Sequence, residues 1–264
     1  MPIERGWCEH QKHKWEKMFF RKKEVVLDCY TTDPAIYKYA KITSGIKHFP
    51  DWWKKLVPSG SNWQKVHKER SGFFGQKTMK NCPGFVNLYK KSFVLPLWSD
   101  LRFYIPSKPI KNYFEYSFAD EYSEVDYHSH EQHNNHYSDD DYQHVKIISP
   151  WFLKCDSDIE WVSMPPVWET INNLESLKFL SGMLNFRHQN GTHVSLFIKK
   201  EEEDLYIDIP CNFPLAFYLP LTERKIKVNH HLVSESELKK VLAEGVGTKK
   251  FFNRNYDSYK KLRK

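Results

Sequence analysis

The sequence predicts a mainly β protein, with a β-sandwich, jelly-roll or cupin-like fold of about ten short strands, a few short helices and a C-terminal helix. Three observations support this class. Short β-branched and aromatic runs recur between turn residues, an Asn-Gly pair separates two alternating runs, and helical spacing of apolar residues is confined to short stretches. The 264 residues are 40% hydrophobic and 16% aromatic, which is enough apolar surface for a sizeable core.

The first core strand is expected at residues 25–30, where a β-branched run meets the turn residues 31–34. Two short helices are expected to follow it. Pro50 suits the first turn of a helix over residues 49–56. A second helix is expected to begin at Pro83, because apolar residues recur after it at helical spacing.

Short extended runs, separated by Pro, Ser and Asp, make up most of the remaining chain. Strands are expected at residues 92–98, 101–105, 112–118, 145–149, 151–155, 159–164, 205–209, 215–219 and 225–230. Pro96 lies inside its run and has no N–H to donate to a neighbouring strand. The strand that contains it is therefore expected to lie at a sheet edge or to carry a bulge.

A β-hairpin is expected over residues 184–198 with Asn190-Gly191 as its turn, because a type I′ turn needs positive φ at both central residues. Counting outward from this turn places His188 opposite His193. Two histidines on neighbouring strands, joined by a carboxylate, hold iron in cupin-like oxygenases. Cross-strand packing of two neutral histidines beside Arg187 is the favoured interpretation of this pair, and a metal site at His188 and His193 is the alternative.

A C-terminal helix is expected after Ser234, which forms a capping box with Glu237. The helix and the basic, aromatic tail behind it span residues 234–264. A single β-rich domain is expected over residues 24–233, and residues 1–23 form a basic leader with seven basic and three acidic residues.

Residues 119–144 form an acidic, His-rich insert with eight acidic residues, five histidines and no Lys or Arg. Imidazole and carboxylate groups are ligands for metals such as Zn and Fe. The insert supplies four candidate ligands at close spacing: His128, His130, His133 and His136. A solvated loop that responds to pH is the alternative, because a metal site needs ligands held on rigid elements. No organic cofactor is expected, so a divalent metal, Fe or Zn, is the candidate cofactor.

Several classes of protein are disfavoured. No apolar run approaches the roughly 18 residues that cross a bilayer, and residues 1–23 carry charges where a signal sequence has a hydrophobic core. The five cysteines are scattered, which is typical of reduced thiols. No nucleophile elbow, HExxH motif or phosphate-binding loop occurs. These absences favour a non-enzymatic protein.

Aromatic residues alternate with lysines between residues 38 and 91, where twelve Lys or Arg face two acidic residues. Such a pattern can bind nucleic acid through phosphate contacts and stacking, but the net charge of +7 is low and no RNA- or DNA-binding motif accompanies it. Aromatic side chains are enriched in protein interfaces. An interaction surface is therefore predicted at Phe49, Trp52, Trp53 and Trp63.

Three segments carry a family resemblance: residues 46–56 (IKHFPDWWKKL), 77–85 (KTMKNCPGF) and 92–100 (SFVLPLWSD). They resemble a family of uncharacterised β-rich proteins encoded by tailed bacteriophages of marine bacteria, and the likeness covers about residues 24–233. The resemblance implies a phage-encoded protein made in the host cytoplasm. It implies no catalytic residue.

Two functions are consistent with these observations. The first is a non-enzymatic assembly or virion-associated module of a phage, which binds a protein partner such as another phage structural protein. The second is a cupin-like, metal-dependent enzyme, such as an iron oxygenase, with His188 and His193 as ligands.

Overall fold

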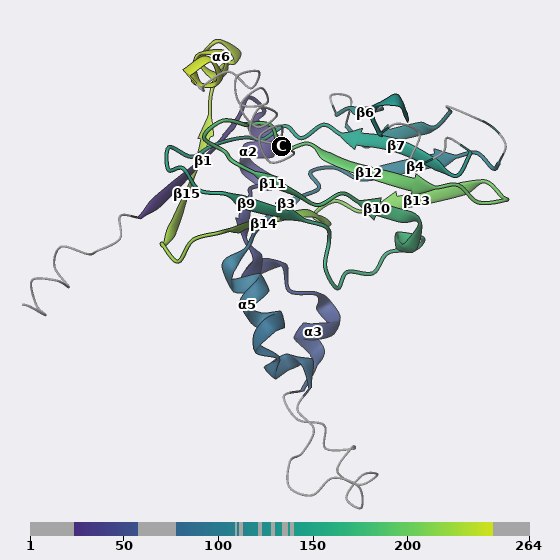
Figure 1. The fold of residues 1–264 in the computed structure, drawn as a ribbon, viewed down its shortest axis with the longest axis horizontal. Helices are drawn as coiled ribbons and strands as arrows, with labels where there is room; N and C mark the ends of the chain where they lie inside the picture. The colour runs from purple at the N-terminus through teal and green to yellow at the C-terminus, as the bar shows by residue number, and fades with distance from the viewer. Residues whose placement is uncertain are drawn as a thin grey trace, which may run out of the picture.

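The computed structural model describes residues 24–57, 78–108, 110, 113–120, 123–127, 130–133, 137 and 140–244. Within them, fifteen strands form four sheets, accompanied by short helices and a C-terminal helix (Figure 1). The prediction of a mainly β, sandwich-like fold is confirmed, with more strands than the expected ten. The leader at residues 1–23 and the tail from residue 245 lie outside the described part of the chain.

The first sheet joins strands from both ends of the described chain, in the order β15-β1-β8 (Ile226–Leu232, Val25–Thr31 and Phe152–Lys154). The central strand β1 pairs in parallel with β15 and antiparallel with β8. The predicted first core strand is therefore present. The turn expected after it continues as helix α2 (Pro34–Tyr39), because the Asp33 carboxylate caps the helix by accepting from the N–H groups of Ala35 and Ile36.

The largest sheet has five strands in the order β11-β9-β14-β3-β2 (Gly182–Leu184, Trp161–Met164, Pro214–Pro220, Phe93–Pro96 and Thr43–Ser44). Strand β3 lies inside this sheet. Pro96 is its last residue and faces Pro214, and the register shifts between Pro214 and Ala216. The edge position predicted for this strand is therefore wrong, and the register shift belongs to the facing strand β14, where Leu215 is the extra residue beside the two facing prolines.

Two smaller sheets complete the fold. One has the order β10-β12-β7-β6 (Leu177–Phe179, Val194–Lys199, Tyr142–Ile147 and Val125–Tyr127), and the other has the order β13-β4-β5 (Leu205–Ile209, Leu101–Ile105 and Glu115–Phe118). Strand β6 and the start of β7 fall within residues 119–144. Part of the predicted insert is therefore paired into a sheet.

The predicted hairpin around Asn190-Gly191 is wrong. The turn lies earlier, where the N–H groups of His188 and Gln189 both donate to the Asn185 carbonyl at 2.9 Å. Strand β11 pairs with β9, while β12 pairs with β7 and β10. The Asn190 side chain donates to the Leu153 carbonyl at 2.8 Å, and Gly191 bridges to Phe152. The Asn-Gly pair thus attaches this segment to β8 instead of turning the chain.

The three predicted helices are present near their predicted positions, in addition to α2. Helix α3 (Asp51–Lys55) begins after Pro50, and α5 begins at the predicted Pro83 and ends at Lys91. Helix α6 (Glu235–Glu244) has the predicted capping box: the Glu237 N–H donates to Ser234 Oγ at 3.3 Å, and the Ser234 N–H donates to the Glu237 carboxylate at 2.8 Å. None of the described helices is long and apolar enough to cross a membrane.

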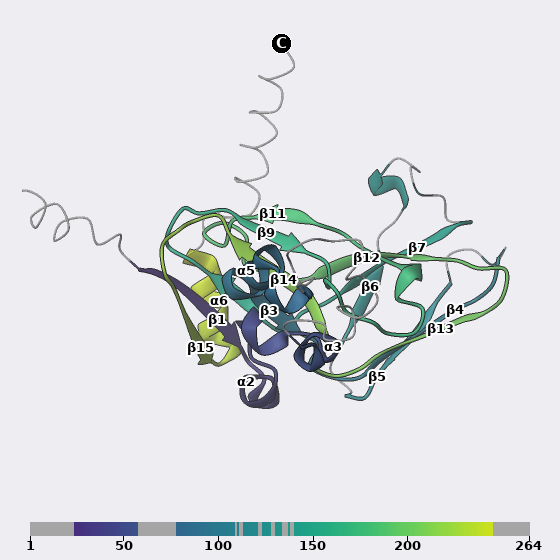
Figure 2. The same ribbon diagram turned by 90° about the horizontal axis from the view of Figure 1, so that it is seen from below.

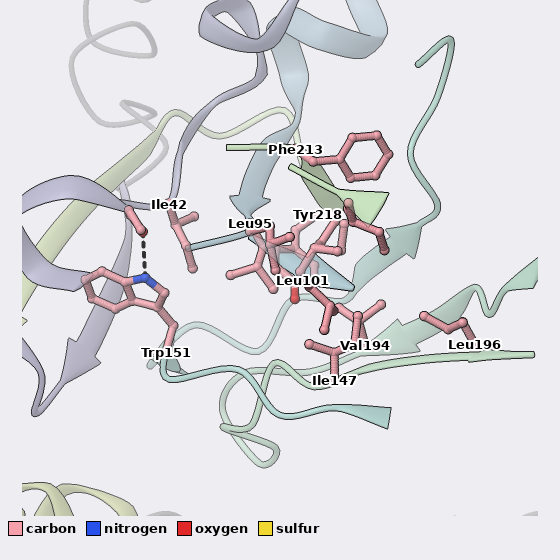
Figure 3. Close-up of a cluster of buried hydrophobic side chains, with 14 of the residues drawn as sticks. Ile42, Leu95, Leu101, Ile147, Trp151, Val194, Leu196, Phe213 and Tyr218 are labelled. Atoms are coloured by element: carbon pink, nitrogen blue, oxygen red, sulfur yellow. Dashed lines mark hydrogen bonds between the residues drawn. The ribbon is translucent and has the colours of Figure 1, made fainter. Parts of the chain in front are cut away.

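One main core runs through all four sheets, and Trp151 lies at one side of the part of it drawn in Figure 3, next to Ile42. The Trp151 side chain is fully buried, and its indole N–H donates to the Ala40 carbonyl at 2.8 Å. The Trp151 carbonyl in turn accepts from the buried hydroxyl of Thr192 at 2.7 Å. Its ring also meets the His230 ring edge to face, with centroids 5.5 Å apart. Trp151 therefore links α2, β15 and the segment before β12.

We expect Trp151→Phe to lower the free energy of unfolding by about 2–4 kcal/mol. The phenyl ring keeps part of the buried apolar area but leaves the Ala40 carbonyl without its donor. Trp98→Phe is the control. The Trp98 indole N–H also donates a hydrogen bond, in this case to Ser123 Oγ, but the Trp98 side chain is only half-buried. Urea unfolding should show a clearly smaller loss for Trp98→Phe, and equal losses would contradict this account.

Candidate functional site

A helical projection stands away from the large sheet (Figure 1). We call it the aromatic knob and define it as residues 45–56, 79–91 and 167–168. It contains the 3₁₀ helices η1 (Gly45–His48) and η2 (Met79–Asn81) with α3 and α5. Helix α5 lies against β14 (Figure 2). At this contact the Tyr89 ring meets Phe217 edge to face. The knob shares a small second core with the large sheet, in which Phe85 and Tyr89 of the knob pack with Val94 of β3 and Phe217 of β14.

Three of the predicted interaction residues build this small core. Phe49 stacks on Trp53 with ring centroids 4.0 Å apart and on Tyr89 at 4.6 Å. Trp52 meets Phe85 edge to face at 5.7 Å. Phe49, Trp52 and Trp53 are half-buried, so they hold the knob together as well as contributing to its surface. Trp63, the fourth predicted residue, lies outside the described residues.

The exposed aromatic residue of the knob is Trp168, which the sequence analysis did not identify. Its side chain is 54% exposed, and its backbone has a left-handed φ of 63°. The Trp168 carbonyl accepts from the Trp52 indole N–H at 2.8 Å, and its ring lies 6.4 Å from Trp52 and 5.7 Å from Phe85. The neighbouring Val167 carbonyl accepts from the Tyr89 hydroxyl at 2.8 Å. Two hydrogen bonds therefore fix the loop that presents this indole.

Lysines surround the aromatic residues. The described part of the knob carries Lys47, Lys54, Lys55, Lys80, Lys90 and Lys91 with one acidic residue, Asp51. The Lys80 ammonium lies 4.0 Å from the centroid of the Trp53 ring and donates to the carbonyls of Trp53 and Lys54 at 3.1 Å. Lys54 pairs with Asp51 at 2.9 Å. The knob therefore carries more basic than acidic residues, although the half-buried Glu169 directly after Trp168 adds a carboxylate near Lys54 and Asp51.

The base of the knob is closely packed. The Gly45 N–H donates to the Ser92 carbonyl at 2.8 Å, and a Cβ on Gly45 would lie 2.5 Å from the Tyr89 carbonyl oxygen. Only glycine therefore fits at position 45, because any larger residue would collide with the end of α5. Next to it, His48 Nε2 lies 2.9 Å from Thr43 Oγ1. Burial lowers the pKa of His48 to about 4, with smaller effects from Lys47 and Lys54.

The predicted histidine sites are dispersed. His188 lies in the turn after Asn185, and His193 is exposed before β12, so the cross-strand pairing that predicted an iron site is absent. The His133 ring packs edge to face on Phe197, with centroids 5.4 Å apart. His128, His136 and the side chain of His130 lie outside the described residues. Among the side chains that the structure describes, no group of three or more His, Cys, Asp or Glu could hold a metal ion.

Comparisons with protein-family models, with curated proteins and with solved structures find no match to this chain.

We expect the stability of the wild-type protein to fall as the pH drops from 6.5 towards 4. The pKa of His48 is about 4 in the folded chain and near 6.5 in the unfolded chain, so the unfolded chain binds more protons in this window. The loss attributable to His48 is on the order of 2–3 kcal/mol. Urea unfolding at pH 7, 5.5 and 4.5, followed by tryptophan fluorescence, measures it.

The matched variant is His48→Gln, which keeps a polar side chain but does not titrate. It should show a smaller decline in stability than the wild type over the same pH range. Parallel pH profiles for the two proteins would show that His48 is not the group responsible.

Proposed function

We propose that this chain is a non-enzymatic protein-interaction module whose aromatic knob binds a partner protein during the assembly of a tailed phage particle. The observation that carries the proposal is the exposed indole of Trp168, which is supported by Trp52 and Phe85 on a knob that carries six lysines. Tryptophan is among the residues that most often dominate the energy of protein interfaces.

The rigidity of the knob supports this role. The Trp168 loop is fixed by hydrogen bonds from Trp52 and Tyr89, and the rings beneath it are stacked. A side chain that is already ordered loses little conformational entropy on binding. Trp168 can therefore enter a pocket on the partner without reorganising its own loop.

The charge of the knob indicates the chemistry of the partner. Lysines around an apolar centre favour a recess with apolar walls and an acidic rim, because complementary charge speeds and orients association. Lys54 and Lys91 form ion pairs with Asp51 and Glu223, and Lys80 donates to backbone carbonyls. The exposed Lys47, Lys55 and Lys90 are therefore the lysines that would meet an acidic rim. Three lysines are few for following the phosphate backbone of a nucleic acid, which makes it a poorer fit.

The phage setting is supported by the resemblance of residues 46–56, 77–85 and 92–100 to phage-encoded proteins. Two of these segments contribute directly to the knob, since they supply α3, η2 and the start of α5. Synthesis in the host cytoplasm and incorporation into the virion follow as parts of the same proposal.

The test is to introduce Trp168→Ala into the phage genome that encodes the chain and to quantify the protein in purified particles by mass spectrometry. We expect the amount of protein in the particles to fall by about tenfold or more. A tenfold change corresponds to a loss of about 1.4 kcal/mol of binding free energy, which is typical of removing a central interface residue. Tyr127→Ala is the matched control, because Tyr127 is 55% exposed on β6, away from the knob (Figure 1).

Unaltered incorporation of the Trp168→Ala protein, with normal folding, would exclude the knob as the docking surface. A wild-type protein that is absent from particles and elutes as a monomer with no partner would refute the proposed function itself.

A further inference from the structure

A second surface, independent of the knob, lies on the solvent-facing side of the β13-β4-β5 sheet. Strand pairing places Tyr206 beside Tyr104 and Tyr104 beside Glu115. The next row along the strands holds Asp208, Arg102 and Ser117. The alternate residues of β4 and β13 are buried, so these two rows form one face. We call it the tyrosine face.

The side chains of this face are held in place by each other. The Tyr104 hydroxyl donates to the Asp204 carboxylate at 3.0 Å, and the rings of Tyr104 and Tyr206 lie 5.1 Å apart. Arg102 donates to both oxygens of Asp208, from Nε at 2.5 Å and from Nη2 at 3.0 Å. These contacts orient two aromatic rings and a planar ion pair before any ligand arrives.

Two adjoining grooves run over the face, with volumes of about 370 and 410 Å³. Both are lined by Arg102 and Ser117. The first also contains Tyr104, Tyr206 and Glu115, and the second continues to Asp100 and Asp208. A ligand with repeating units could therefore occupy both grooves and cross the Arg102–Asp208 pair.

The geometry points to a binding site for a neutral oligosaccharide on the tyrosine face. A sugar ring has an apolar C–H side that can lie on a tyrosine ring, and its hydroxyl groups both donate and accept hydrogen bonds. The Tyr206 ring is 57% exposed and open to such stacking. The Arg102–Asp208 pair uses two of the five N–H donors of the guanidinium group, so the pair offers donors and acceptors side by side.

The charges on the grooves select against other stacking ligands. Three carboxylates, those of Asp100, Glu115 and Asp208, line the grooves with a single arginine, Arg102. This excess of negative charge repels the phosphates of a single-stranded nucleic acid, which otherwise also stacks on aromatic rings. A face rich in acceptors requires a ligand that brings donors, and hydroxyl groups supply them without a charge.

The test is a binding assay of the full chain, by isothermal titration calorimetry, against hexasaccharides of β-1,4-glucose, α-1,4-glucose, β-1,4-xylose, β-1,4-mannose and β-1,4-N-acetylglucosamine. Oligothymidylate and hexalysine serve as charged comparison ligands. We expect at least one hexasaccharide to bind, and Tyr206→Ala to weaken its binding by about tenfold or more. Tyr39→Ala is the matched control, because Tyr39 is 71% exposed but lies on α2.

A second variant separates stacking from folding. Tyr104→Phe keeps the ring and loses only the hydrogen bond to Asp204, so it should bind more tightly than Tyr206→Ala while melting at a similar temperature. Failure of every hexasaccharide to bind at millimolar concentration overturns the proposal. Unchanged binding by Tyr206→Ala, or tighter binding of oligothymidylate or hexalysine at the same face, overturns it as well.

Discussion

The indole N–H of Trp151 is a polar group buried in the main core, and its hydrogen bond to the Ala40 carbonyl fixes the path of the chain after α2. A buried donor without a partner would cost about 1–3 kcal/mol, so the two groups hold each other in place. The next few residues follow from this contact. The Ile42 carbonyl meets His230 Nε2 at 2.8 Å, and β2 joins the large sheet. The knob begins at Gly45, directly after β2, so Trp151 helps to fix where the chain enters it, while the Gly45–Ser92 hydrogen bond and the Tyr89–Phe217 contact hold its base.

Local features of the sequence predicted the helices well and the sheets less completely. Pro50, Pro83 and the Ser234–Glu237 capping box act within one turn of their own helix, so neighbouring residues are enough to recognise them. Asn190-Gly191 misled the prediction because the Asn190 amide bonds to the Leu153 carbonyl, a contact between distant residues. The division of fifteen strands into four sheets likewise depends on pairings that no local pattern records.

In the candidate site, too, local sequence identified some residues, while contacts between distant residues decided their arrangement. Composition was enough to select Phe49, Trp52 and Trp53, yet their packing against Phe85 and Tyr89 depends on how α3 and α5 fold together. Trp168 comes from a loop more than a hundred residues later in the chain, and the hydrogen bond from Trp52 that brings it to the knob spans 116 residues. Neither the knob nor the tyrosine face is continuous in sequence. The two surfaces lie on different parts of the molecule (Figure 1) and differ in charge, the first rich in lysine and the second in carboxylates.

The parallel pairing of β1 with β15 has a consequence for synthesis on the ribosome. Val25 pairs with Ile226, so one edge of β1 has no partner until nearly all of the described chain has been made. A nascent chain would meanwhile carry an apolar strand with open hydrogen-bonding groups, which is a site for pairing with other chains. The first sheet can close only after β15 has left the exit tunnel. Completion of this sheet is therefore a late event in the synthesis of the chain.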